Sequence, residues 1–159
     1  MRLSRSDITL ALVLLLSAAA RSLSPGRAAE PAPAPETAIR AALEKWTADF
    51  NAGHAEKICD LFALDLRYDY RGQPERGYGD ICALLHRLLA DGTKHYAYSF
   101  TVKEILVADD LTVVRLSWTL RMRSRGPQGF ARSTESGMDI FRKQADGSWK
   151  IIRYIAYEE

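Results

Sequence analysis

Apolar side chains recur with a helical period in the first part of the chain. From Glu36 to Asn51 they follow one another at intervals of three and four residues, which places Ile39, Leu43, Trp46 and Phe50 on one face of an amphipathic helix. The same kind of spacing predicts a shorter helix over His54–Ala63 and a third helix over Tyr78–Leu89. A brief strand, Leu66–Tyr70, is expected between the second and third helices.

Beyond Gly92 the hydrophobic period changes from helical to two, which is typical of half-buried strands. The last two strands are joined through Asp146-Gly147, a dipeptide that favours a hairpin turn. The long strands are expected around Tyr96–Val102, Arg115–Met122, Ala131–Lys143 and Trp149–Tyr157. Helices that precede an antiparallel meander predict an α+β fold.

The N-terminus has the pattern of a secretory signal peptide. Arg2 and Arg5 precede an apolar run of 13 residues, Ile8–Ala20, which is followed by small residues. A membrane-spanning helix needs about 20 residues, so we expect a cleaved signal over residues 1–28 and no stable membrane span; an uncleaved interfacial anchor is the alternative. The mature protein should be periplasmic or secreted. Alternating prolines predict a linker over residues 29–35, and a single domain over 36–159.

Charge and motifs exclude several classes of function. With 22 basic and 20 acidic residues spread along 159 positions, the chain lacks the basic patch of a nucleic-acid-binding protein. His54, His86 and His95 have no carboxylate or cysteine at ligand spacing, so we expect no metal site. There is no glycine-rich phosphate loop and no GxSxG motif, and we therefore expect no nucleotide cofactor and no triad hydrolysis.

The chain has two cysteines, Cys59 and Cys82. An exported domain meets oxidising conditions, in which a structural disulfide between them is expected. The alternative is a pair of buried thiols, because the sequence does not give the separation of the two Cα atoms.

Four motifs carry a resemblance to a known superfamily. They are "W..DFNAGH" at the end of the first helix, "LFALD", "G.P..GY.DI" before the third helix, and "DIFRKQADGSWKIIRYIAY" in the closing hairpin. In this order they resemble the ketosteroid isomerase and SnoaL-like branch of the nuclear transport factor 2-like superfamily. The resemblance implies a cone-shaped α+β barrel, with three N-terminal helices packed on a curved, mostly antiparallel sheet. It also implies a ligand pocket inside the cone and a homodimer formed through the outer face of the sheet.

The resemblance also suggests catalytic positions. Ketosteroid isomerase uses an Asp base and an oxyanion hole made of a Tyr and a protonated Asp. Here Asp139 resembles the oxyanion-hole acid and Asp69 resembles the base, the latter after a one-residue gap. The position that resembles the oxyanion Tyr is Trp46, whose indole donates one hydrogen bond but is not a phenol. Both carboxyls have structural alternatives: Asp139 would pair with Arg153 or Arg115, and Asp69 would lie beside Arg67 or Arg71.

Three functions remain open from the sequence. The first, which we favour, is binding of a small, partly hydrophobic molecule in the cone, with the pocket lined by Trp46, Phe62, Tyr98, Trp118 and Phe141. The second is a cofactor-independent isomerase, cyclase or dehydratase that uses Asp69 and Asp139 as acid and base. The third is a protein-interaction module whose own aromatic side chains fill the pocket.

Overall fold

The structure, a computed structural model, describes residues 33–124, 126 and 129–159. It contains one six-stranded sheet in the order β2-β1-β6-β5-β4-β3. All neighbouring strands are antiparallel except β1 and β6, which run parallel. The strands are β1 (Phe62–Tyr70), β2 (Arg76–Gly77), β3 (Lys94–Ala108), β4 (Leu111–Ser124), β5 (Phe130–Lys143) and β6 (Trp149–Glu158).

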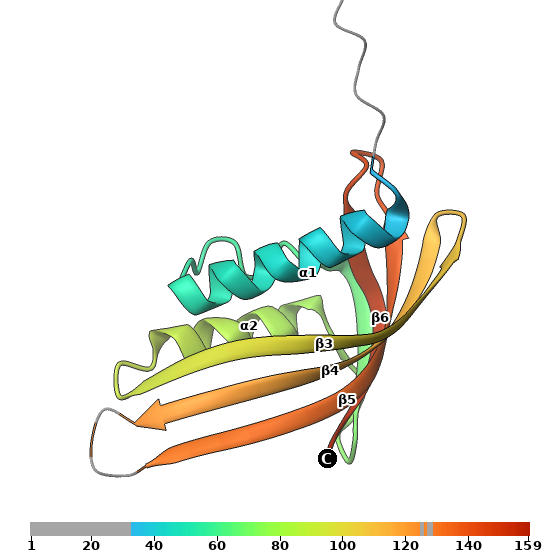
Figure 1. Ribbon diagram of the computed structural model, residues 1–159. Helices are drawn as coiled ribbons and strands as arrows, with labels where there is room; N and C mark the ends of the chain where they lie inside the picture. The colour runs from blue at the N-terminus through green and yellow to red at the C-terminus, as the bar shows by residue number, and fades with distance from the viewer. Residues whose placement is uncertain (1–32, 125, 127–128) are drawn as a thin grey trace, which may run out of the picture. The chain divides into compact units, whose positions relative to one another are not determined.

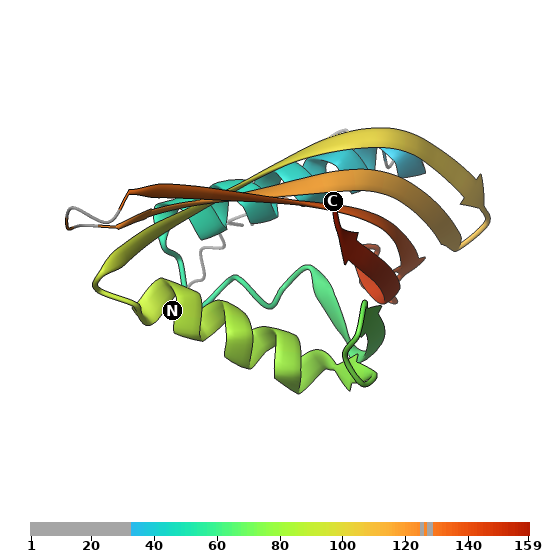
Figure 2. The ribbon, with the colours of Figure 1, turned by 90° about the horizontal axis from the view of Figure 1, so that it is seen from below.

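Two helices lie in the concave side of the bent sheet (Figures 1 and 2). Helix α1 (Pro35–Ala52) buries the apolar stripe expected from the sequence, packs on β3 and β6, and ends at Gly53, which is left-handed with φ 79°. Helix α2 (Tyr78–Ala90) packs against β1, β2 and β3. The α+β fold with a mostly antiparallel sheet is therefore as expected. The helical start at Pro35 takes in the last residue of the expected linker.

The expected second helix over His54–Ala63 does not form. Residues 54–61 instead make successive turns in which an amide donates to the carbonyl three residues earlier, as from Lys57 to His54 and from Asp60 to Lys57 at 3.0 Å. Several carbonyls of this segment are taken by other elements. The Leu61 oxygen accepts from the amide of Ile151 on β6 at 2.9 Å, so the chain leaves the turns directly into β1. Three helices were expected, and the described residues contain two.

Cys59 in this turn segment and Cys82 on α2 lie side by side. Their Cα atoms are 5.6 Å apart, within the range that a disulfide requires, and the structure joins the two sulfur atoms. The bridge would tie the turn segment to α2; its presence in the protein stays a prediction. The signal peptide over residues 1–28 lies outside the described residues. Within the part of the chain that is described, no helix has the length and apolar character needed to cross a membrane.

Candidate functional site

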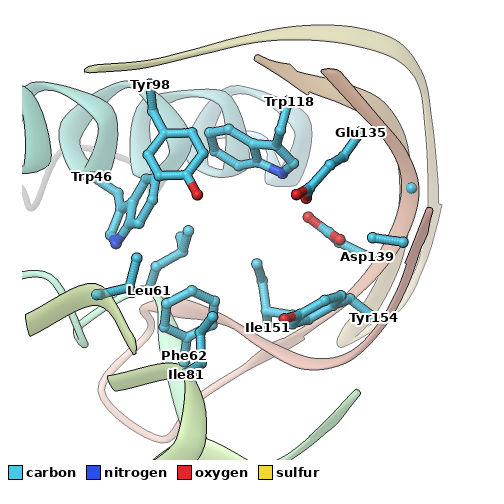
Figure 3. Close-up of a pocket in the computed structure, with 13 residues that line it drawn as sticks. Trp46, Leu61, Phe62, Ile81, Tyr98, Trp118, Glu135, Asp139, Ile151 and Tyr154 are labelled. Carbon is cyan, nitrogen blue, oxygen red and sulfur yellow. The ribbon is translucent and has the colours of Figure 1, made fainter. Parts of the chain in front are cut away.

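A pocket opens between the concave face of the sheet, α1 and α2, and we call it the inner pocket (Figure 3). The cavity proper has a volume of about 70 Å³, and the empty space together with the open mouth amounts to about 550 Å³. Most of the thirteen residues that line it are apolar or aromatic. They are Trp46, Leu61, Phe62, Ile81, Leu85, Tyr98, Trp118, Glu135, Gly137, Asp139, Ile151, Tyr154 and Ala156.

Asp139 points from β5 into the inner pocket and is only 4% exposed. Its Oδ2 has no hydrogen-bond partner among the described residues. Burial raises the pKa of this carboxyl to about 7, and the neighbouring indole of Trp118 opposes part of that rise. Near neutral pH, Asp139 is therefore divided between a neutral acid that can donate a hydrogen bond and a carboxylate without a cation.

The basic residues named from the sequence as structural partners of Asp139 are engaged elsewhere. Arg115 pairs with Glu104 at 3.0 Å on the exposed face. Arg153 donates to the backbone carbonyls of Asp65 and Ile152. The ion pair considered as the alternative for Asp139 is therefore not formed in the structure.

Glu135 is a second carboxyl in the inner pocket, and the sequence analysis missed it. It lies four residues before Asp139 on the same face of β5, and Figure 3 shows both carboxyl groups on one wall. Its Oε1 accepts a hydrogen bond from the hydroxyl of Tyr70 at 3.2 Å. Burial raises the pKa of Glu135, the bond from Tyr70 lowers it, and the nearby Glu158 raises it. The strand period of two is the pattern that would have found Glu135, because it shares its parity with Gly137 and Asp139.

Asp69, expected as the base, lies outside the inner pocket. It is exposed on β1, where the neighbouring Tyr68 takes the inward position and stacks on Tyr154 with ring centroids 4.4 Å apart. Adjacent residues of a strand face opposite sides of the sheet. The one-residue gap that aligns Asp69 with the base of ketosteroid isomerase therefore decides on which side of the sheet the Asp69 carboxyl is expected. The structure does not bring Asp69 and Asp139 together. Asp69 is near Arg67 in the sequence but forms no ion pair with it. Arg67 pairs with Glu75 instead, at 3.7 Å.

Four of the five aromatic residues expected to bind ligand do line the inner pocket: Trp46, Phe62, Tyr98 and Trp118. The fifth, Phe141, does not, because it is fully buried in the hydrophobic core. A shift in register between Ile140 and Phe141 in the β5–β6 pairing separates it from the part of the strand that carries Asp139. Tyr154 on β6 also lines the pocket; it belongs to the closing-hairpin motif but was not among the residues expected to bind ligand.

Trp46 packs against the pocket but its indole N–H is already used. The nitrogen donates to the Ile58 carbonyl at 2.7 Å and points away from the pocket centre (Figure 3). Trp46 thus ties α1 to the turn segment and does not offer a donor to a ligand. The hydroxyl of Tyr98, by contrast, points into the pocket, and burial raises the pKa of this phenol, which keeps it a neutral donor.

Comparison with known proteins identifies the family. The model of the SnoaL-like domain matches residues 43–154. The chain belongs to the SnoaL-like domain family. No curated protein matches the sequence.

Solved structures have the same fold as this SnoaL-like domain. A conserved protein from Planctomyces limnophilus is 19% identical, with TM-score 0.70, and the match covers 78% of this chain and 95% of that one. A ketosteroid isomerase-like protein from Erwinia carotovora atroseptica is 18% identical, with TM-score 0.61 and coverage of 77% and 94%. ActVI-ORFA from Streptomyces coelicolor is 11% identical, with TM-score 0.64 and coverage of 78% and 96%. At these identities the similarity concerns the fold alone.

The chemistry available in this SnoaL-like pocket comes from two carboxyls and two phenols, those of Tyr98 and Tyr154. Within the described ranges, no group of three or more His, Cys, Asp or Glu side chains is arranged to hold a metal ion. Glu135 and Asp139 can accept or donate protons, Tyr98 can donate a hydrogen bond, and the remaining walls are mostly apolar. The arrangement can bind a small molecule, orient it by one polar group, and move a proton.

Proposed function

We propose that this protein binds a small, partly apolar molecule in the inner pocket. The observation that carries the proposal is the pocket itself, an aromatic and aliphatic cavity in which a few polar groups converge at one wall. Ligand sites in proteins commonly have this composition, because apolar walls supply affinity and a few polar groups fix orientation. The open pocket also supports this function over an interaction module filled by its own side chains.

Binding is tested by titrating isotope-labelled protein, made from the full chain, with toluene and benzyl alcohol. The indole N–H resonances are followed by NMR, since Trp118 lines the inner pocket and Trp149 does not. We expect a saturable shift of the Trp118 resonance and no shift of the Trp149 resonance.

Two matched variants place the binding in the pocket. Ile81→Phe adds volume to a lining residue of α2, whereas Leu88→Phe makes the comparable change on the same helix away from the pocket lining. The first should abolish the Trp118 shift and the second should keep it. Binding would be disproved if toluene, benzyl alcohol and benzylamine all left the Trp118 resonance of the wild-type protein unchanged.

A second function, acid–base catalysis, is supported by the two carboxyls that share one pocket wall. In an enolisation, the Glu135 carboxylate would take the proton alpha to a ketone, while protonated Asp139 donates a hydrogen bond to the oxygen that becomes negative. The proton on Glu135 would then return to carbon, so that the residues end as they began. Glu135 replaces Asp69 in this scheme because Asp69 lies outside the pocket.

Catalysis is tested with acetophenone in heavy water, where removal of an alpha proton exchanges hydrogen for deuterium in the methyl group. We expect exchange above the buffer rate in the wild-type protein and its loss in Glu135→Gln. Glu104→Gln, which removes a carboxylate that pairs with Arg115 on the exposed face, is the control. Exchange at the buffer rate in the wild type would withdraw the catalytic function for this ketone class and leave binding as the function.

The proposed function also includes export of the domain from the cytoplasm. The signal-peptide pattern in residues 1–28 supports secretion of the domain that carries the pocket. Mass spectrometry of the protein recovered from the periplasm or medium should give the mass of a chain that lacks about 28 N-terminal residues. An intact N-terminus on a membrane-associated protein would favour the uncleaved anchor instead.

A further inference from the structure

We propose that the ligand of the inner pocket carries a protonated amine, which the wall formed by Glu135 and Asp139 binds. This inference rests on the proposed binding function and names the chemical class of the ligand. Two acidic side chains project into the same pocket, and none of the thirteen lining residues is Lys, Arg or His. Charged groups inside proteins are normally paired. Because this acidic wall has no basic side chain beside it, a cationic ligand would supply the missing partner.

The hydrogen bonds at this wall leave a carboxyl oxygen free to accept a hydrogen bond from a ligand. Tyr70 donates to Oε1 of Glu135, whereas Oδ2 of Asp139 is buried and has no partner among the described residues. An ammonium group has up to three N–H donors and no acceptor, and can therefore bond to two carboxyls at once. Such charge-assisted bonds are shorter and stronger than bonds between neutral groups.

Aromatic rings flank each carboxyl on the neighbouring strands. Trp118 on β4 is directly opposite Glu135, and Tyr154 on β6 is directly opposite Asp139. On the far side of the space, the rings of Tyr98 and Trp46 lie 5.4 Å apart (Figure 3). The faces of Trp and Tyr rings attract cations, and the attraction strengthens where water is excluded. A small amine on an apolar or aromatic body matches both the acidic wall and the aromatic surroundings.

The pH dependence of amine binding follows from the groups that face Asp139. Besides the indole of Trp118 on β4, the groups around this wall are phenols and acids: Tyr154 on β6, on which Tyr68 of β1 stacks, Tyr98 on β3, and Glu135 on β5, which has Tyr70 of β1 and Glu158 of β6 as its own neighbours. Burial raises the pKa of Tyr70 to about 12 and raises those of Tyr98 and Tyr154, so these phenols stay neutral. Affinity for an amine should rise as Asp139 loses its proton near pH 7. A neutral ligand that accepts a hydrogen bond from Asp139 would show the opposite trend.

The test compares benzylamine with benzyl alcohol, which has nearly the same shape but no charge. Both are titrated into the full-chain protein at several pH values between about 6 and 8, where benzylamine stays protonated, and the Trp118 indole resonance reports occupancy. We expect benzylamine to bind at least about tenfold more tightly than benzyl alcohol near pH 8. This preference should be lost in Glu135→Gln and kept in Glu104→Gln. The rise in benzylamine affinity with pH should disappear in Asp139→Asn.

The outcomes separate the amine inference from the binding function. If benzyl alcohol shifts the Trp118 resonance with equal or higher affinity, the amine inference fails and binding stands. If the preference for benzylamine survives in Glu135→Gln, the acidic wall is not its cause and the inference also fails. If neither compound shifts Trp118, the proposed function fails together with the inference.

Discussion

At the residue scale, one side chain of the inner pocket, Asp139, lowers the stability of the folded state. Asp139 is buried without a cation, and its pKa is raised from 3.8 to about 7. In the unfolded chain an aspartate ionises near its ordinary pKa, so between these values the folded state holds a proton that the unfolded state has released. Stability therefore falls as the pH rises through this window and stays at the lower level above it.

Asp139→Asn should remove this loss of stability. The amide resembles the protonated acid in shape and cannot ionise, so the variant and the wild type should be about equally stable near pH 4. Near pH 8 we expect the variant to be more stable, by on the order of 2–4 kcal/mol. Urea unfolding at a series of pH values measures the difference, with Asp69→Asn, an exposed carboxyl outside the pocket, as the control. A difference that does not change with pH would contradict the buried, uncompensated acid.

The residues of the site could be predicted from the sequence only as far as strand parity was known. The period of two groups Asp139 with Gly137 and Phe141 on one face of its strand, but it does not say whether that face points inward, and the same holds for Trp118 on its own strand. The same period places Glu135 on the face of β5 that carries Asp139. The direction of Asp69 could not be predicted in this way. Its strand is short, runs parallel to β6, and is irregular between Phe62 and Arg67. In such a strand a shift of one residue puts Tyr68 in the place of Asp69.

At the scale of elements, β5 and β6 approach closely where they form the pocket wall. Gly137 on β5 is paired with Ala156, and a Cβ at Gly137 would lie 2.9 Å from the backbone oxygen of Ile155. Backbone on a neighbouring strand does not move aside as a flexible side chain does. Glycine here allows the two strands to lie close beside the pocket.

Gly137→Ala should therefore destabilise the protein. We expect a loss of about 1–3 kcal/mol, because the added methyl forces the β5 and β6 backbones apart. Gly79→Ala is the matched control: it lies in α2, and its Cβ would meet no atom within 4 Å. Alanine in a helix should be neutral or stabilising by up to about 1 kcal/mol. Equal stability of the two variants in urea would show that the β5–β6 approach is not restrictive.

The turn segment and α2 form a second pair of elements, joined through Cys59 and Cys82. If the bridge forms, titration of the denatured, unreduced protein should find no free thiol. Closing a loop with 23 residues of separation stabilises a domain by about 3 kcal/mol, and a double Ala variant should lose a similar amount. Two reactive thiols in the unreduced, denatured protein would refute the bridge.

The sequence predicted the long elements well and the short connection poorly. The helical stripe of α1 and the alternation in the long strands come from many positions that agree, and each element is stabilised by burial of its own apolar face. The segment 54–61 has few positions, and its structure depends on partners far away in sequence. Ile58 accepts a bond from Trp46, and Leu61 accepts one from Ile151. The spacing of apolar residues contains no information about such distant contacts, and it therefore predicted a helix over this segment.

At the scale of the whole domain, the two faces of the sheet differ in use. The concave face carries the inner pocket, while the other face exposes apolar side chains on adjacent strands. Met138 and Ile155 are directly opposite each other on β5 and β6, and are 46% and 60% exposed. Tyr157, two residues further along β6, is exposed on the same face. Neighbouring exposed apolar side chains of this kind are typical of surfaces that associate.

We expect this face to associate with a second copy of the chain, so light scattering of the mature protein should give twice the mass of one chain. Ile155→Lys places a charge in the centre of the exposed apolar group and should reduce the mass to that of a monomer, because a desolvated, unpaired charge opposes association. Leu106→Lys, at an exposed position on β3, should leave the dimer intact. A wild-type monomer at high micromolar concentration would refute the dimer. Dissociation by Leu106→Lys but not by Ile155→Lys would move the interface to the β3 edge of the sheet.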